Sequence, residues 1–353
     1  MTGFRCVVFS LFSFILISSV PVVSGAAGSK EQKAGKSVKL ALKFVPGQSE
    51  KYRVITEVLR SVESGSIQKK AKSRRRTGKT GDYIEMVFTQ TVKSVNPKGN
   101  AVVKITINEV KFRSVEKNKV TLDFDSTKKT KNSADKSNID KNGVVKNKPG
   151  ALAKLIGKSY TIELSPKTRV VRILDIQDAR SVIDKNKQGT AVSTLLSADS
   201  IVLRHEVHPL SSSKTQTVRK GDKWNEKKKF NFGMMGKKSY NKTYTLKQLR
   251  EQDKKQLALV EMEAGPSAEN VRDAVGQPIN VFSKLFDCND KYTGSMSFDA
   301  DSGRVLEYTE NLDIKWVAVD PISAKRLSGA VKKSPTAIIM TAARHHKLQI
   351  VGK

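Results

Sequence analysis

The sequence predicts a mainly β (α+β) protein that consists of two similar antiparallel sheet units with helices packed on one face. Apolar and polar residues alternate with a period of two over most of the chain, and turns rich in glycine, proline or asparagine separate the alternating runs. The order of the runs in the first half recurs in the second. Hydrophobic residues make up 38% of the chain and aromatic residues 6%, a composition that excludes collagen-like, mucin-like and multi-span membrane proteins.

Residues 1–25 are predicted to be a secretory signal peptide. Arg5 supplies the positive charge, an apolar run follows up to Val20, and small residues surround the expected cleavage site. The run contains four serines and is shorter than the about 20 apolar residues of a membrane span, which disfavours an uncleaved anchor. We therefore expect a secreted or periplasmic protein without a transmembrane span after cleavage. Its single remaining cysteine, Cys288, is expected to be a small buried side chain without a disulfide partner.

The elements of the first half follow in order from the alternation and the turns. Asn96–Asn100 and Ser165–Thr168 have the composition of tight turns between strands. Between and beyond them the periodicity predicts strands over 38–44, 52–59, 84–88, 103–107, 160–164 and 170–176, a helical turn over 151–156 and helix within 177–203.

The second half begins at 204 and contains the most regular strand of the chain. Leu306, Tyr308, Leu312, Ile314 and Trp316 alternate there with polar residues, so one face of the strand is expected to be buried and the other solvated. The preceding segment 299–303 resembles the start of a calcium loop, but its glycine comes one residue too early, and a hairpin turn is favoured. Further strands are predicted near 230–232 and over 240–246, 257–262 and 292–298, with helix over 268–286.

Matching segments suggest that the two halves are duplicates. Thr91–Val95 matches Thr245–Leu249 ahead of a turn and a strand, and the run that begins at Tyr160 matches the one that begins at Tyr292. We predict a first unit at 26–203, with basic inserts at 66–80 and 126–150, and a second unit at 204–353, with a basic C-terminal segment.

The chain carries 65 lysines and arginines against 34 acidic residues, a formal net charge of +31. Most of the excess lies in four segments, 66–80, 126–150, 214–242 and 322–353. The two inserts have few large apolar residues and are expected to be mobile loops. They could bind an anionic polysaccharide or another polyanion, or simply form a solvated surface; nucleic acid is disfavoured, because no aromatic residues are interspersed with the bases. The candidate contacts are Lys69, Lys70, Lys72, Arg74, Arg75, Arg76, Lys128, Lys129 and Lys131.

Two motifs, Leu152–Pro166 followed by Arg169–Val171, and Val218–Trp224, resemble those of an uncharacterised family of exported bacterial proteins with a duplicated β-sheet unit. Where that family has a glycine turn, this sequence has Thr168-Arg169. The resemblance implies an envelope protein that is distantly similar to the half-barrels of periplasmic lipoprotein carriers. It implies no catalytic residues.

No motif in the sequence specifies a catalytic, metal or cofactor site. His205 and His208 are three residues apart, and a surface pair is favoured over a metal site. Nucleophile elbows, phosphate-binding loops and dinucleotide-binding motifs do not occur. We therefore expect no catalytic residues, metal or cofactor, and keep a hydrolase without a recognisable motif as the weakest alternative.

The favoured function is a non-enzymatic envelope protein that binds a lipid or another apolar or amphipathic ligand on a concave sheet; a polyanion-binding surface protein is the main alternative. Aromatic residues in strands usually belong to the core, but they can also line an apolar groove. The candidate ligand-binding residues are Trp224, Phe230, Phe232, Tyr308 and Trp316.

Overall fold

The structure is a computed structural model that describes residues 36–66, 76–128, 145–146, 150–183, 185, 187–213, 217–252, 255–267, 286–319 and 336–352. The predicted signal peptide, much of the basic inserts and all but the last residue of the helix predicted over 268–286 lie outside these residues. Contacts divide the chain into a unit at 1–35 and a unit at 36–353, and only the second contains described residues.

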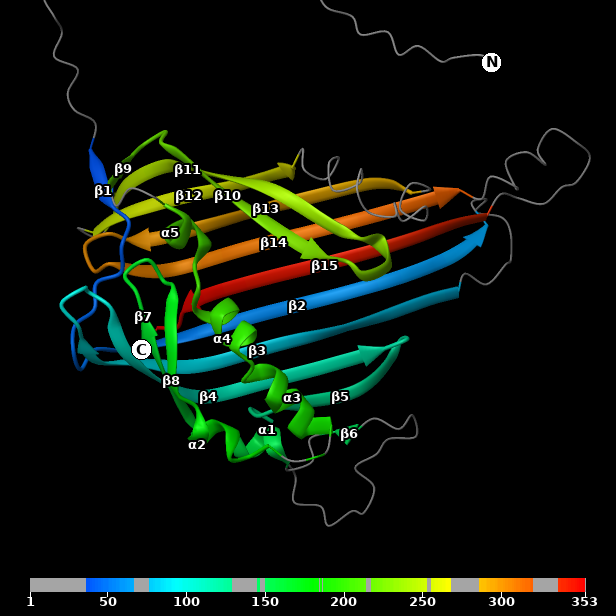
Figure 1. Cartoon of the computed structure of the whole chain (residues 1–353), viewed down its shortest axis with the longest axis horizontal. Coiled ribbons are helices and arrows are strands. Elements are labelled where there is room, and N and C mark those ends of the chain that lie inside the picture. Colours follow the sequence, from blue (N-terminus) through cyan, green and yellow to red (C-terminus); the bar gives the residue numbers. More distant parts are fainter. Residues whose placement is uncertain are drawn as a thin grey trace, which may run out of the picture. The chain divides into compact units, whose positions relative to one another are not determined.

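The described part is mainly β, as predicted, and almost all of its strands belong to one open antiparallel sheet (Figure 1). A small separate sheet pairs β1 with β9. The strands are β1 (Ser37–Lys39), β2 (Ser49–Ser66), β3 (Arg76–Val95), β4 (Ala101–Glu116), β5 (Lys119–Asp125), β6 (Val145–Lys146), β7 (Ser159–Leu164), β8 (Val170–Asp175), β9 (Thr217–Arg219), β10 (Lys223–Asn231), β11 (Lys237–Gln252), β12 (Lys255–Pro266), β13 (Asp287–Asp299), β14 (Arg304–Val319) and β15 (Thr336–Ile350).

The last strand, β15, lies in the middle of the large sheet. The strand order is β10-β11-β12-β13-β14-β15-β2-β3-β4-β5-β6, and Figure 1 shows the red β15 between the orange β14 and the blue β2. On the edge of β4 away from β3, β7 pairs with one half and β5 with the other, and β8 pairs with β7. The basic C-terminal segment, for which the sequence analysis predicted no strand, thus joins the two halves of the sheet.

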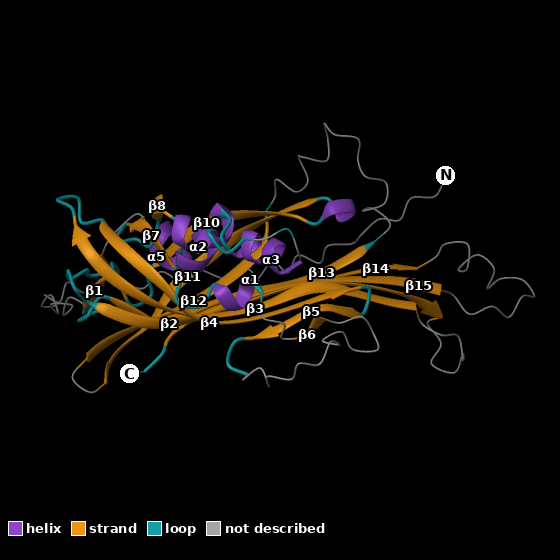
Figure 2. Cartoon of the chain, turned by 90° about the horizontal axis from the view of Figure 1, so that it is seen from below, coloured by secondary structure: helices purple, strands orange, loops and turns teal. Residues whose placement is uncertain are grey.

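Short helices cover one face of the sheet, as Figure 2 shows. Their buried side chains, such as Leu152, Val192 and Ile201, belong to the same hydrophobic core as the inward side chains of β4. The helices are α1 (Ala151–Lys154), α2 (Gln177–Arg180), α3 (Lys187–Leu195), α4 (Ala198–His205) and α5 (His208–Ser212), with a 3-10 turn at Gly233–Met235. Among the helices that the structure describes, none is long and apolar enough to cross a membrane.

Three turns predicted from the sequence are found between strands, at 96–100, 165–168 and 299–303. In the second, Thr168 has a φ of +61°, the left-handed conformation in which glycine is the usual residue and a β-branched side chain is strained. Its Oγ1 accepts a hydrogen bond from the amide of Val207 (2.9 Å), and its single proton is shared between the carbonyls of Lys167 (2.7 Å) and Val207 (3.1 Å). These buried bonds offset the strain and tie the turn to the chain between α4 and α5.

The two halves share a local irregularity at the residues that the sequence comparison aligned. The β3–β4 register shifts between Val92 and Ser94, and the β11–β12 register shifts between Leu246 and Gln248. In each half a glycine amide donates to the carbonyl at the start of this bulge, from Gly47 to Val92 and from Gly221 to Leu246. The strand orders β2-β3-β4-β7-β8 and β10-β11-β12-β13-β14 also agree. The division into duplicated units stays a prediction.

The structure corrects three expectations. Cys288 is exposed rather than buried, and its Sγ lies 2.6 Å from Nζ of Lys238. His205 and His208 are both buried and do not form a surface pair. Residues 76–80 of the first predicted basic loop belong to β3, because the β2–β3 pairing extends up to Arg76.

Candidate functional site

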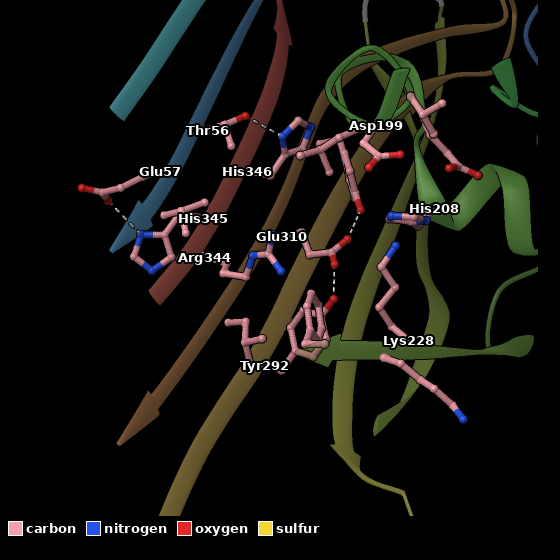
Figure 3. A pocket seen from close by; sticks show the side chains of 18 residues that line it. Thr56, Glu57, Asp199, His208, Lys228, Tyr292, Glu310, Arg344, His345 and His346 are labelled. Atoms are coloured by element: carbon pink, nitrogen blue, oxygen red, sulfur yellow. Dashed lines mark hydrogen bonds and ion pairs between the residues drawn. The ribbon is translucent and has the colours of Figure 1, made fainter. Parts of the chain in front are cut away.

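A cavity of about 350 Å³ lies between α4, β10 and the inward face of the sheet (Figure 3). Its volume falls at the lower end of the range of small-molecule sites, about 300–1,000 Å³. The lining residues are Thr56, Glu57, Val58, Asp199, Val202, Leu203, Glu206, His208, Lys228, Lys229, Phe230, Tyr292, Tyr308, Glu310, Leu312, Arg344, His345 and His346.

Helix α4 forms one wall of the cavity, because one of its faces packs into the core and another lines the cavity. Ser197 caps the helix by accepting a hydrogen bond from the amide of Ser200. Ile201 and His205 point into the core, whereas Val202 and Leu203 lie on the side that lines the cavity. Leu203 is 38% exposed, and a large apolar side chain that remains exposed inside a cavity provides a surface for an apolar ligand.

The register of β14, β15 and β2 places polar side chains side by side on the sheet side of the cavity, which we call its floor. Glu310 on β14 is directly opposite His346 on β15, and His346 is directly opposite Thr56 on β2. Since side chains of cross-strand partners lie on the same face, these three form a continuous polar row. Arg344, two residues before His346, lies on the same face of β15.

Glu310 is bound by three donors. Its Oε2 accepts from Nζ of Lys242 at 3.1 Å and from the hydroxyl of Tyr308, and its Oε1 accepts from the hydroxyl of Tyr292. The ammonium of Lys242 also lies 3.3 Å from Oε2 of Glu226. Lys242 has no exposed side-chain surface, so a fully buried cation is shared between two carboxylates.

Both carboxylate oxygens of Glu226 have polar neighbours. Oε2 accepts a 2.7 Å hydrogen bond from the hydroxyl of Tyr244 in addition to its contact with Lys242, and Oε1 lies 3.3 Å from Nδ1 of His208. Burial alone would raise the pKa of Glu226, but His208, Lys242 and Tyr244 outweigh it and lower this pKa to about 2. The same balance applies to Glu310, where Lys242, His208 and the two tyrosine hydroxyls lower the pKa to about 2 against the effect of burial.

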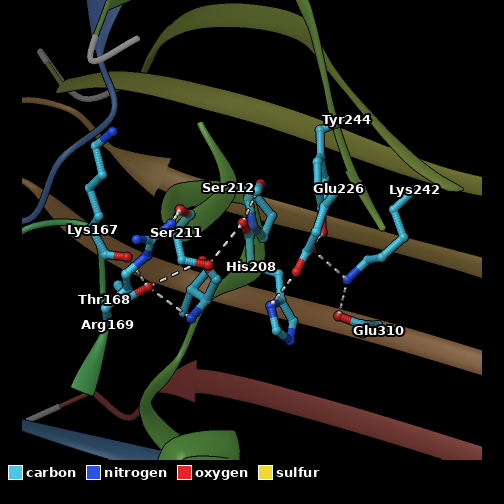
Figure 4. Close-up of polar contacts among 12 residues, drawn as sticks. Lys167, Thr168, Arg169, His208, Ser211, Ser212, Glu226, Lys242, Tyr244 and Glu310 are labelled. Carbon is cyan, nitrogen blue, oxygen red and sulfur yellow. Dashed lines mark hydrogen bonds and ion pairs between the residues drawn. The ribbon is translucent and has the colours of Figure 1, made fainter. Parts of the chain in front are cut away.

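His208 reaches this network because α5 is held by the turn between β7 and β8 (Figure 4). The guanidinium of Arg169 donates to the Ser211 carbonyl at 2.7 Å, and Lys167 donates to the Ser213 carbonyl at 2.5 Å. Within α5, the Ser212 hydroxyl donates to the carbonyl of His208 at 2.6 Å. The turn that contains Thr168 thus holds α5, and with it His208, although the turn lies about 40 residues earlier in the sequence.

His346 is buried and kept neutral. Desolvation, reinforced by the neighbouring His208 and Arg204, lowers the pKa of His346 to about 4 against the opposing effect of Glu310. Its Nδ1 lies 3.3 Å from the Thr56 hydroxyl. Its Nε2 is buried without a hydrogen-bond partner in the described part of the chain. A buried ring nitrogen without a partner costs free energy, so this nitrogen marks a position where a ligand atom would be stabilising.

Arg344 lines the cavity and extends toward Glu310 and Tyr292 in Figure 3. The centre of its guanidinium lies 5.1 Å from the centroid of the Phe230 ring, a cation–π contact. Among the described residues it has no hydrogen-bond or ion-pair partner. Burial and the nearby Arg60 lower the pKa of Arg344 against the opposing effect of Tyr292 and Glu310.

The five aromatic residues predicted from the sequence lie on the inward face, but only two of them line the cavity. Phe230 and Tyr308 contribute to the lining. Phe232 and Trp316 are buried and in edge contact, with ring centroids 5.4 Å apart. Trp224 stacks on Tyr244 and donates from Nε1 to the Pro209 carbonyl, so these three residues belong to the core.

The candidate polyanion contacts lie mostly outside the described residues, namely Lys69, Lys70, Lys72, Arg74, Arg75, Lys129 and Lys131. Arg76 begins β3, and Lys128 lies 3.7 Å from Asp125 in an exposed ion pair. A second cavity, of about 540 Å³, is lined by residues of β2–β5 and by Lys128. The polyanion interpretation stays a prediction.

The buried histidines do not form a joint site. His205 Nε2 lies 2.7 Å from the Tyr160 hydroxyl, which also accepts a hydrogen bond from Arg204, while His208 faces Glu226. His345 and His346 point to opposite faces of β15, as their adjacent positions in a strand predict; His345 contacts Glu57 and Asp313. No group of three or more metal-ligating side chains is found within the described ranges.

The sequence analysis missed Lys242, Glu310, Arg344 and His346. For the first two a signal existed. Lys242 lies between Tyr240 and Tyr244, and Glu310 between Tyr308 and Leu312, so each is a charged residue at an inward position of an otherwise apolar alternation. Burying a charge is costly unless it is paired, and two such positions of opposite sign predict an internal ion pair.

Comparisons with known proteins find neither a protein-family model nor a curated protein that matches the chain. The resemblance to exported bacterial proteins therefore stays a prediction. A solved structure described as "Lipid-protein interactions in lipovitellin" is similar with a TM-score of 0.37 and 11% sequence identity. The match covers 88% of this chain and 26% of that chain, so this chain spans about a quarter of the lipovitellin chain.

Proposed function

We propose that the protein binds a small amphipathic molecule in the cavity beneath α4. The observation that carries this proposal is the composition of the lining. Val58, Val202 and Leu203 offer apolar surface, while Arg344 and Nε2 of His346 make no hydrogen bond to the described residues. Nε2 carries the ring proton, and is a donor, in the tautomer whose Nδ1 accepts from the Thr56 hydroxyl. A mostly apolar cavity with a few convergent polar groups is the usual form of a small-molecule site.

The state of the carboxylates favours binding over acid–base catalysis. Glu226 and Glu310 have pKa values near 2 and are held by Lys242 and tyrosine hydroxyls. A general base works best when its pKa lies near the operating pH and its lone pairs can reach a substrate. These carboxylates meet neither condition. Glu310 is a fixed part of the cavity lining, and Glu226, which does not line the cavity, shares Lys242 with it.

The proposed location is outside the cytoplasm, because the first 25 residues have the pattern of a signal peptide. In that setting the ligand would be a component or product of the cell envelope with an apolar part. This extends the binding proposal and is tested separately, by fractionating cells that express the full chain and sequencing the N-terminus of the mature protein.

Saturation-transfer NMR with a series of alkyl carboxylates and alcohols, from hexanoate and hexanol to longer chains, tests the binding. We expect saturable binding to the wild type. Val202→Trp fills the cavity from α4 and is expected to abolish it. The matched control is Val171→Trp on β8, because Val171 is 47% exposed and does not line the cavity. If no member of the series binds saturably, or if Val202→Trp binds as well as the wild type, the proposal is wrong.

A further inference from the structure

We infer that the ligand carries an anionic group, such as a carboxylate, sulfate or phosphate, and that Arg344 binds this group inside the cavity with the Nε2 of His346 as a second donor. This inference rests on the proposed function and specifies the class of its ligand. It follows from which hydrogen-bonding groups of the cavity are already used and which are not.

The acceptors of the floor are occupied by the protein itself. Both oxygens of Glu310 accept hydrogen bonds from tyrosine hydroxyls or from Lys242. Oε2 of Glu226 accepts from Tyr244 and contacts Lys242, and its Oε1 lies 3.3 Å from Nδ1 of His208. A cationic ligand would have to displace these internal partners and leave Lys242 buried without compensation, which is strongly unfavourable. The floor therefore selects against a cation.

Two nitrogen-bearing groups of the cavity lining make no hydrogen bond to the rest of the described chain. In the described part of the chain, Arg344 makes no hydrogen bond or ion pair within 4 Å; its guanidinium lies over Phe230 and is attracted by Glu310 and Tyr292. Nε2 of His346 is buried without a hydrogen-bond partner there. Both side chains lie on the same face of β15, two residues apart. A guanidinium presents several donors in one plane, a geometry that matches carboxylate, sulfate and phosphate oxygens.

The aromatic side chains do not form a free cage for a ligand cation. Phe230, Tyr292 and Tyr308 line the cavity together, and such a cluster can bind a quaternary ammonium. Here the guanidinium of Arg344 already lies over Phe230, and Lys242 lies 5.6 Å from the ring centroid of Tyr292. The cationic side chains of Arg344 and Lys242 therefore already occupy positions over these rings that a ligand cation would need.

The charges at the rim balance each other. The lining includes two acidic residues, Asp199 in α4 and Glu206 directly after it, and two lysines of β10, Lys228 and Lys229. Charges in contact with solvent are screened by salt, so the rim contributes little to the choice of ligand. The selectivity comes from His346, which is buried, and from Arg344, which is the cross-strand partner of Leu312 and whose guanidinium lies over Phe230.

The test compares octanoate, octanol and octyltrimethylammonium by isothermal titration calorimetry on the full mature chain. We expect octanoate to bind most tightly, and Arg344→Gln to weaken octanoate about 10- to 100-fold, as the loss of a charge-assisted hydrogen bond does, with little effect on octanol. Arg113→Gln is the matched control, an exposed strand arginine outside this cavity. Circular dichroism verifies that each variant is folded.

The outcomes separate the inference from the proposed function. If octanol or octyltrimethylammonium binds as tightly as octanoate, or if Arg344→Gln retains the affinity of the wild type for octanoate, the anion inference is wrong and the cavity remains an amphipathic site. If acetate binds as tightly as octanoate, or if none of the alkyl compounds binds, the proposed function itself fails. Imidazole ¹⁵N NMR adds a direct readout, because octanoate but not octanol should shift the Nε2 resonance of His346.

Discussion

Lys242 and Glu310 lie on strands that are separated by two others, yet Nζ of Lys242 is 3.1 Å from Oε2 of Glu310. Strands three places apart in a flat sheet are separated by roughly 14 Å, so both side chains must extend over the intervening strands β12 and β13. The residues beneath them are small: Ala264 is the cross-strand partner of Lys242, and Gly294 is the partner of Glu310.

Lys242→Met is predicted to destabilise the protein by about 3–5 kcal/mol, because it leaves Glu226 and Glu310 buried without their cation. Chemical denaturation monitored by circular dichroism measures the change. Lys247→Met is the matched control on the same strand, since Lys247 pairs with Glu261 at the surface and such pairs contribute less than about 1 kcal/mol. Equal effects of the two substitutions would contradict the buried ion network.

Gly294→Ala is predicted to destabilise the protein by about 1–3 kcal/mol through overpacking. A Cβ at this position would lie 2.6 Å from the Thr309 carbonyl oxygen and 3.0 Å from the end of the Met262 side chain. At Gly265, also in a strand, a Cβ would meet nothing within 4 Å, so Gly265→Ala should be tolerated. Thermal unfolding of the two variants in parallel gives the comparison, and a neutral Gly294→Ala would show that the space around Glu310 is not restricted.

His346 is predicted to make the protein less stable as the pH falls from about 6.5 to about 4. Its folded-state pKa is about 4, below its ordinary value of 6.5, so the unfolded chain binds more protons in this window and the free energy of unfolding decreases by up to about 3 kcal/mol. His346→Gln should remove this part of the pH dependence, which denaturation curves across this pH range would detect.

His345→Gln is the control for that experiment. Asp313 and Glu57 raise the pKa of His345 against the effect of desolvation, so its contribution is complete below 6.5 and is lost as the pH rises through the raised value. The two neighbouring substitutions should therefore change the stability profile on opposite sides of pH 6.5. A change on the same side for both would contradict the assignment of His346 as the buried neutral histidine.

Thr168→Val is predicted to cost about 1–3 kcal/mol, because it leaves the buried amide and carbonyl of Val207 without the Thr168 hydroxyl. Thr168→Gly relieves the strain of the positive φ and should cost less than Thr168→Val. If Thr168→Gly is the more destabilising of the two, the turn does not depend on these hydrogen bonds in the way described.

The local pattern of the sequence predicted most of the strands, because each alternating run of one antiparallel strand carries its own signal. It predicted no strand for β5, β6, β9 and β15. The local pattern failed where the pairing between strands decides which side chains are buried. The most regular strand was expected to bury Leu306, but a bulge opposite Ser297 and Phe298 reverses the alternation, and Val305 is buried instead. No local signal marks that bulge.

The candidate site was predicted only in part for the same reason. Phe230 and Tyr308 were identified as aromatic residues on an inward face. Arg344 and His346 were treated as part of a basic terminal segment, and their place beside Glu310 depends on the pairing of β15 with β14 and β2. That pairing brings together residues about 290 positions apart, such as His346 and Thr56, which periodicity in one strand cannot reveal.

The most direct test of the binding site is a crystal structure of the mature protein soaked with bromooctanoate, in which anomalous scattering locates the bromine. We predict bromine density between α4 and the inward face of the sheet, near Leu203 and Leu312, with the carboxylate at Arg344. Bromine density confined to the second cavity beside Tyr83 and Phe124, or to neither cavity, would contradict the account.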